Sequence, residues 1–131
     1  MMNPTRTQGT RRTGKNKADN GSKWIRSERR WGIYRRDEYC CIYCGKKMPH
    51  RFDGEKEVLD GSKFTLDHFR PVELGGSNDS GNLGTACKCC NSSKQAKSLG
   101  DFLVWLEETR GVDPAEIKAR IRRNTRRKVK K

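Results

Sequence analysis

Four of the six cysteines form two Cys-x-x-Cys pairs, Cys41 with Cys44 and Cys87 with Cys90, and 42 residues separate the pairs. Two pairs of this spacing are the usual way for four thiolates to reach a tetrahedral zinc ion, each pair on its own tight turn. The first residues are polar and Arg-rich, without the apolar stretch of a secretory signal, so we expect a reducing compartment in which cysteines bind metal. The spacing therefore predicts a structural zinc site.

Two other uses of these cysteines stay open, a redox Cys-x-x-Cys motif and free buried thiols. The presence of two pairs without a thioredoxin-like βαβ pattern disfavours the redox use. Cys40 and Cys89 are surplus and either could substitute within its turn, but the two-residue spacing selects the other four cysteines. A zinc deaminase would need His-x-Glu and Pro-Cys-x-x-Cys, whereas an Arg stands two residues after His68 and an Ala precedes Cys87.

The second chemical signal is the pair Asp67-His68, which lies between the two cysteine pairs and ahead of a glycine-rich segment. A single Asp-His pair is by itself more often structural than catalytic. The chain has one other histidine, His50, which follows a proline in a polar segment and is expected at the surface. The residues around His68 therefore decide whether it has a catalytic role.

Those residues follow the order C-x-x-C-G, L-D-H-x-x-P, G-G-x-N, N-L and C-x-x-C-N-x-x-K, which strongly resembles the HNH endonuclease family of ββα-metal nucleases with an embedded four-cysteine zinc site. The resemblance covers about residues 31 to 97 and leaves out both chain ends. The matching residues are Cys41, Cys44, Gly45, Leu66, Asp67, His68, Pro71, Gly75, Gly76, Asn78, Asn82, Leu83, Cys87, Cys90, Asn91 and Lys94.

The resemblance implies separate catalytic roles for these residues in phosphodiester hydrolysis. That reaction needs a water nucleophile, a group to take its proton and positive charge beside the phosphate. His68 would be the general base, and Asp67 and Asn91 would give oxygen ligands to a divalent cation such as Mg²⁺, Mn²⁺ or Ni²⁺. Asn82 would brace the loop that carries the histidine. The family's third letter is often His, so Asn91 makes this an H-N-N variant. Lys94 would either contact a phosphate or be solvated.

The elements that must position these groups can be read from local patterns. Residues 63–69 and 83–86 predict short strands, and the segment from Cys90 predicts a helix after the second strand. Neighbouring residues on a strand point to opposite faces, so the strand must end or twist near Asp67 and His68 for both to reach one phosphate. The paired glycines after Pro71 make such a bend plausible.

The flanking segments give clearer signals. Ser27 is a candidate N-cap for a short helix carrying Trp31, and residues 46–62 predict a loop or hairpin. A capping box at Ser98 begins a helix that ends at Gly111, and a further helix starts at 113.

The chain has 131 residues, of which 31% are hydrophobic and 35% charged, so a large apolar core is not expected and disulfides, a metal or a partner would have to support the fold. Its net charge of +14 is uneven: residues 1–36 contain 11 Lys or Arg and two acidic residues, residues 111–131 contain nine and two, and the centre is nearly neutral. Basic arms around a neutral centre are typical of nucleic-acid proteins, although such arms can also be solvated tails. Neither arm has the apolar face of a membrane-surface helix, and no span is present.

We therefore predict an α+β fold, a small zinc-stapled ββα-metal core with flanking helices. The expected organisation is a disordered basic arm over 1–23, a nuclease domain over 24–111 and a basic helix or tail over 112–131. The predicted function is metal-dependent DNA cleavage leaving 5′-phosphate and 3′-hydroxyl ends, in a cytoplasm, with phage packaging or another DNA-processing system as a possible context. The alternative is a non-catalytic zinc module that binds nucleic acid; it would need none of Asp67, His68 and Asn91.

Overall fold

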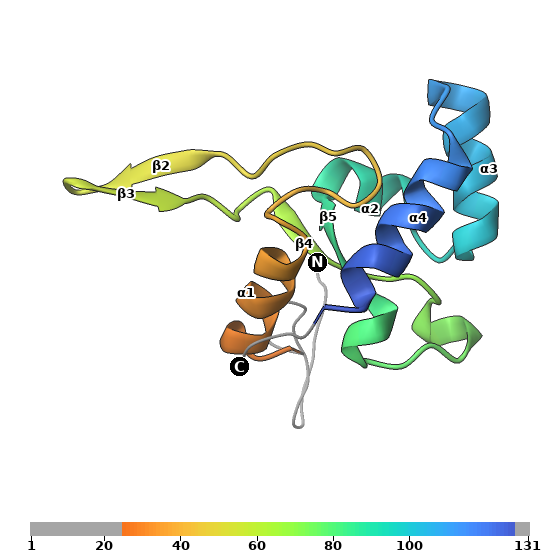
Figure 1. Ribbon diagram of the computed structural model, residues 1–131, viewed down its shortest axis with the longest axis horizontal. Coiled ribbons are helices and arrows are strands. Elements are labelled where there is room, and N and C mark those ends of the chain that lie inside the picture. Colours follow the sequence, from red (N-terminus) through yellow and green to blue (C-terminus); the bar gives the residue numbers. More distant parts are fainter. Residues whose placement is uncertain (1–24, 128–131) are drawn as a thin grey trace, which may run out of the picture.

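The computed structural model describes residues 25–127, so the predicted disordered arm over 1–23 and the last four residues lie outside the described part of the chain. The described residues form an α+β structure with two small antiparallel sheets (Figure 1), which confirms the predicted class. In chain order the helices and strands are α1 (Ser27–Arg36), β2 (His50–Asp53), β3 (Lys56–Leu59), β4 (Phe64–His68), β5 (Leu83–Cys87), α2 (Lys88–Lys94), α3 (Leu99–Arg110) and α4 (Pro114–Thr125).

The centre of the molecule is the β4–β5 pair with α2 following directly. The strands are antiparallel, with Asp67 opposite Gly84 and His68 opposite Leu83. All five residues of β5 are buried, which is why this strand reads as a small apolar run rather than an alternating one. The helix begins two residues before the predicted Cys90 and ends at Lys94, because Gln95 takes a positive φ of 50°.

The segment 46–62 forms the predicted hairpin. Strands β2 and β3 pair from His50 opposite Leu59 to Asp53 opposite Lys56, and the hairpin projects away from the rest of the molecule (Figure 1). Every residue of β2 is exposed, so water surrounds most of this hairpin. Only its base, around Leu59, packs against the core.

Helix α1 forms where the sequence predicts a short helix, but its start differs. Ser27 is the first helical residue and Arg26 is the N-cap without a side-chain hydrogen bond, so the prediction of Ser27 as N-cap is wrong. The helix is instead held by its far end. The side chain of Arg36 forms two hydrogen bonds to Asp37 and one to the backbone oxygen of Leu83, and Asp37 accepts from the backbone N–H of Thr85. This buried pair ties α1 to β5.

Both C-terminal helices follow their predicted caps. Ser98 accepts a hydrogen bond from the N–H of Asp101, and Gly111 ends α3 with a positive φ of 68°. Asp113 caps α4, which packs on α3 and near the turn before β5. The treatment of 112–131 as a separate unit stays a prediction.

The core lies between these layers. Tyr43 packs edge-to-face on Phe102 of α3, with ring centroids 5.0 Å apart, and Ile117 of α4 is buried beside them in the same cluster. No helix within residues 25–127 is long and apolar enough to cross a membrane.

Candidate active site and metal centre

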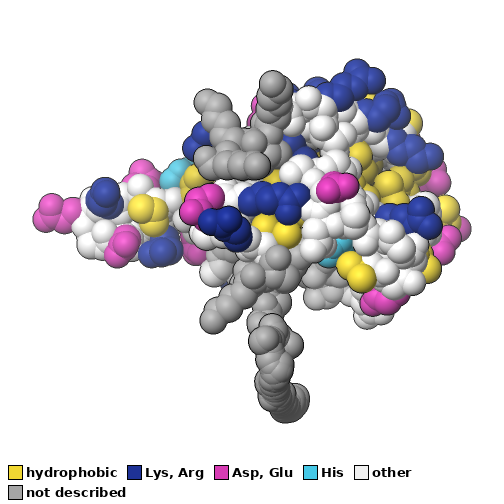
Figure 2. All heavy atoms as spheres, turned by 90° about the horizontal axis from the view of Figure 1, so that it is seen from below, with side chains coloured by type: hydrophobic (Ala, Val, Ile, Leu, Met, Phe, Trp, Pro, Cys, Tyr) yellow, Lys and Arg dark blue, Asp and Glu magenta, His cyan; other side chains and the backbone are white. Residues whose placement is uncertain are grey.

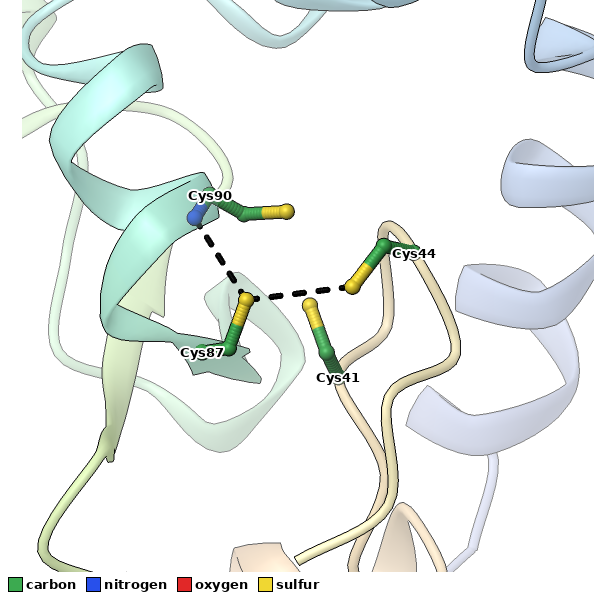
Figure 3. A group of neighbouring side chains, drawn as sticks. All are labelled: Cys41, Cys44, Cys87 and Cys90. Carbon is green, nitrogen blue, oxygen red and sulfur yellow. Dashed lines mark hydrogen bonds between the residues drawn. The ribbon is translucent and has the colours of Figure 1, made fainter. Parts of the chain in front are cut away.

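The four predicted cysteines converge from two turns. Cys41 and Cys44 lie on the loop after α1, while Cys87 and Cys90 lie at the junction of β5 and α2, and their sulfur atoms point toward one another (Figure 3). All four Sγ atoms lie within 4.8 Å of one another, and those of Cys44 and Cys87 are 3.7 Å apart. Zinc–sulfur bonds of about 2.3 Å in a tetrahedron place sulfurs about 3.8 Å apart, so the set fits zinc in ligand type and spacing.

The thiols are closely coupled. A hydrogen bond with Cys44 raises the pKa of the Cys41 thiol to about 12, and a hydrogen bond from Cys41 lowers the pKa of Cys44. Four thiols at this separation cannot all ionise without a cation between them. The backbone N–H of Cys90 also points at the Sγ of Cys87, at 3.4 Å, and would stabilise a thiolate there.

The surplus cysteines have separate positions. Cys40 lies half-buried and its Sγ is within 3.3 Å of the backbone oxygen of Glu38, while Cys89 is exposed next to Arg110. Neither belongs to the four-sulfur group, as the spacing predicts. Arg110 also lies 4.0 Å from the Sγ of Cys90, so it adds positive charge beside this group.

Residues of α1, β4 and α2 line a groove of about 840 Å³. Asp67 and His68 from the end of β4 line it together with Asn91 from α2. The sequence left open how two neighbouring strand residues could face one site. Both residues line the groove, as do the other three residues of β4; Asp67 is buried, and His68, the last residue of the strand, is half-buried.

Asp67 is held on two sides. Its Oδ2 accepts a hydrogen bond from the Tyr43 hydroxyl and lies 3.4 Å from the ammonium of Lys94. Burial raises the pKa of the Asp67 carboxyl, and the Tyr43 hydrogen bond and the Lys94 charge oppose this rise. Burial and the negative charge of Asp67 raise the pKa of Tyr43 well above its usual value, so the phenol stays a donor.

Lys94 does not occupy either of its predicted environments. Its side chain is fully buried, and its ammonium donates to the backbone oxygen of His68 at 2.8 Å as well as pairing with Asp67. The predictions of a phosphate contact or a solvated position are therefore wrong. A buried ammonium needs such partners because water cannot reach it.

His68 is oriented by the glycine-rich loop. Its Nε2 lies 2.8 Å from the Oδ1 of Asn78, and an amide oxygen can only accept, so Nε2 carries the hydrogen. In the neutral ring Nδ1 is then the basic nitrogen. Helix α1 contributes indirectly, since Arg29 donates to the backbone oxygen of Asn78.

Asn82 braces the same loop with three hydrogen bonds. Its amide oxygen accepts from the N–H of Arg70 at 2.9 Å, and its nitrogen donates to the backbone oxygens of Arg70 and Ser77. Gly76 makes this closure possible, because a Cβ there would lie 1.7 Å from the oxygen of Arg70. The loop that follows His68 is thereby closed on itself.

Tyr43 and the paired residues Arg36 and Asp37 were not singled out by the sequence. Tyr43 lies between Cys41 and Cys44 in the sequence, where spacing alone gives no sign that its hydroxyl donates to Asp67. Asn78 was part of the matching pattern without an assigned role. Its contact with His68 depends on how the loop folds back, which only the structure gives.

Comparison with known proteins agrees with this arrangement. Residues 41–97 match the model of the family described as HNH endonuclease. The matched segment begins at Cys41, the first of the four clustered cysteines, and ends just after α2, so it contains both cysteine pairs and the Asp67, His68 and Asn91 positions. Among curated proteins, none matches the chain.

Proposed function

We propose, on the premise that residues 41–97 form an HNH endonuclease domain, that this protein is a metal-dependent endonuclease that hydrolyses DNA phosphodiester bonds. One observation carries the proposal: Asp67, His68 and Asn91, from two different elements, line one groove. A nucleic-acid binder needs no such combination of a base and two oxygen donors. This combination weighs against the alternative of a non-catalytic zinc module.

His68 takes the proton from the attacking water in this proposal. The hydrogen bond from Nε2 to Asn78 leaves Nδ1 free of hydrogen in the neutral ring, so Nδ1 is the proton acceptor. The bracing of the loop by Asn82 keeps Asn78 in reach of the ring. A positioned base of this kind contributes roughly 10²–10⁴-fold to the rate.

Asp67 and Asn91 would hold the catalytic cation. A carboxylate and an amide oxygen are hard donors that suit Mg²⁺ or Mn²⁺, which keep several water ligands and bind substrate phosphates. When bound, the cation supplies positive charge beside the scissile phosphate and the leaving oxygen. The partners of Asp67 support this assignment, because Tyr43 and Lys94 fix the carboxyl at the groove.

The four cysteines would hold a structural zinc ion. Four thiolates fill a tetrahedral ion and leave no position for water, so this ion takes no part in hydrolysis. It would instead pin the loop after α1 to the start of α2 and so fix the groove. The family match supports a nucleic-acid substrate, and DNA is our choice within that class.

Charge supports a polyanionic partner. The groove is lined by Arg30, Arg51 and Lys88, and α4 adds exposed cations including Arg122 and Arg123. Figure 2 shows basic side chains gathered at the end of the molecule away from the hairpin, whereas acidic and basic groups alternate along the hairpin. Phage packaging or another DNA-processing system in a cytoplasm would provide such a substrate.

The test is nicking of supercoiled plasmid by protein with its zinc retained, in Mg²⁺, Mn²⁺ or Ni²⁺, with the same series in excess chelator as the control. Nicking that requires the added ion and leaves 5′-phosphate ends supports the proposal. Tight DNA binding without nicking in any ion would instead favour the non-catalytic module.

A further inference from the structure

One wall of the catalytic groove comes from outside the segment that matches the family. Helix α1 contributes Arg30, Trp31 and Tyr34, and all three precede residue 41, where the match begins. The base of the hairpin adds Arg51 to the same groove. The three α1 residues thus lie outside the matched segment, whereas Arg51 lies within it.

Trp31 is the residue in this wall that needs an explanation. Its side chain is 37% exposed although it lies beside a buried cluster. The ring is nevertheless fixed: it packs edge-to-face on Tyr34 with centroids 5.0 Å apart, and a Cβ on Gly61 would meet its Cη2 and Cζ2 atoms at 3.3 Å. Because this indole is held rigidly and part of its surface is open to a polar groove, it can stack on a planar ligand without losing much side-chain entropy.

The surroundings of Trp31 favour a nucleotide over another flat ligand. Arg30 and Arg51 line the same groove, and Arg30 is oriented by a hydrogen bond to the Tyr34 hydroxyl at 3.2 Å. Cations in the same groove as an aromatic surface can bind the phosphates that flank a base. Val72, 58% exposed, gives the groove a second apolar surface.

A base inside an intact duplex stacks on its neighbours and cannot present its face to a side chain. An aromatic platform in a groove that also holds the catalytic histidine therefore selects for a nucleotide that is unpaired or flipped out. Resting on the proposed function, we propose that Trp31 stacks an unpaired base of the substrate next to the scissile phosphate, so that the enzyme prefers single-stranded or locally unpaired DNA over intact duplex.

The test uses the native protein first. A short single-stranded oligonucleotide with one cleavage site is prepared with an abasic residue at each position in turn, and single-turnover half-saturation is measured for each. An abasic residue at one position near the cut should raise the half-saturation concentration about 10- to 100-fold, the range expected for losing one stacked base. Abasic residues at neighbouring positions should raise it much less. The duplex of the same sequence should be cleaved less efficiently than the single strand.

The variants then assign that effect to Trp31. Trp31→Leu should show the same loss on the intact oligonucleotide and no further loss on the critical abasic one, because the two deletions remove a single contact. Trp31→Phe should recover part of the loss. Trp105→Leu is the matched control, since Trp105 stacks on Phe102 in α3 and does not line the groove. Trp31→Leu and Trp31→Phe should both keep their zinc content and unfolding midpoint close to native.

Failure of this proposal and failure of the nuclease proposal give different results. If cleavage occurs but every abasic position costs less than about twofold, or if Trp31→Leu weakens intact and abasic substrates equally, stacking on Trp31 is ruled out. If no cleavage occurs, stacking is tested by the fluorescence emission of Trp31 in a Trp24→Phe/Trp105→Phe variant, in which Trp31 is the remaining tryptophan. Quenching by single-stranded DNA supports stacking, and unchanged emission overturns it.

Discussion

The Nε2 atom of His68 lies 2.8 Å from the Oδ1 atom of Asn78, ten residues along the chain. This contact joins the end of β4 to the glycine-rich loop and determines which ring nitrogen carries the hydrogen. Because Asn78 is also held by Arg29 of α1, the orientation of the proposed base depends on a helix outside the matched segment. In its proposed role, His68 would be a base oriented by a third group, the arrangement typical of activated catalytic groups.

Variants of Asn78 test whether this residue orients the His68 ring, while leaving His68 itself in place as the proposed proton acceptor. Asn78→Ala should lower kcat by roughly 2- to 10-fold, the scale of one neutral hydrogen bond, with little change in DNA affinity. Asn78→Asp keeps an acceptor and adds negative charge, which favours the protonated ring, so the acid limb of its pH–rate profile should move to higher pH. Identical profiles for native, Ala and Asp proteins would mean that this contact does not orient the base.

The four-cysteine site should be indispensable for folding. Cys44→Ser should lose zinc and most ordered structure, because structural zinc contributes on the order of 10 kcal/mol in small domains. Cys89→Ser is the matched control, since Cys89 is exposed and outside the four-sulfur group, and it should keep zinc and fold normally. Metal analysis and circular dichroism measure both. A native protein that stays folded after complete removal of zinc would contradict the assignment.

The buried pair of Lys94 and Asp67 predicts a coupled effect on stability. Lys94→Met leaves a buried carboxylate without its cation and should cost about 3–5 kcal/mol of unfolding free energy. The double variant Lys94→Met/Asp67→Asn should recover much of that loss, because no buried charge remains. Equal loss in the single and double variants would mean that Lys94 acts through packing alone.

The same pair predicts a pH dependence. Burial raises the pKa of Asp67 above its unfolded value, so its contribution to stability is greatest at low pH and declines as pH rises through the folded-state pKa. Lys94→Met removes a group that opposes the rise, so this decline should be larger. Between about pH 5 and about pH 8, the gap in urea midpoint between the single and double variants should therefore widen as pH increases.

Position 91 should set the preference for the catalytic ion. Asn91→His would replace an amide oxygen by an imidazole, which favours borderline ions, so activity should persist but shift from Mg²⁺ toward Ni²⁺. Asn91→Ala should lose most activity with every ion. Initial nicking rates across a metal series measure both. Native rates for Asn91→Ala in Mg²⁺ would show that Asn91 is not a ligand.

The sequence predicts most where a residue's type alone restricts its environment. The capping residues Ser98 and Asp113 and the stop at Gly111 depend on contacts within a few residues, and the structure has them where the sequence places them. The two cysteine pairs are far apart in the sequence, but thiols in this spacing restrict one another through a shared ligand, and the four lie together as expected. The short strands expected over 63–69 and 83–86 likewise correspond to β4 and β5, both of which pack in the core.

The remaining site depends on contacts between distant segments. Asn78 contacts His68 in a loop that closes on Asn82, and Tyr43 donates to Asp67 from a segment 24 residues earlier in the chain. The sequence places Lys94 at a phosphate or in solvent. Lysine is rarely buried, yet the carboxylate of Asp67 and the strand-end carbonyl offset the burial of Lys94. Such pairs leave no periodic pattern in the sequence.

The most direct test of catalysis in this groove compares plasmid nicking by native protein and His68→Ala in Mg²⁺, with zinc content and DNA affinity measured on the same samples. Removal of the base should slow nicking by roughly 10²-fold or more while zinc and affinity stay native, and added imidazole should restore part of the rate. A His68→Ala protein that nicks DNA as fast as the native chain would contradict the assignment of His68 as the general base.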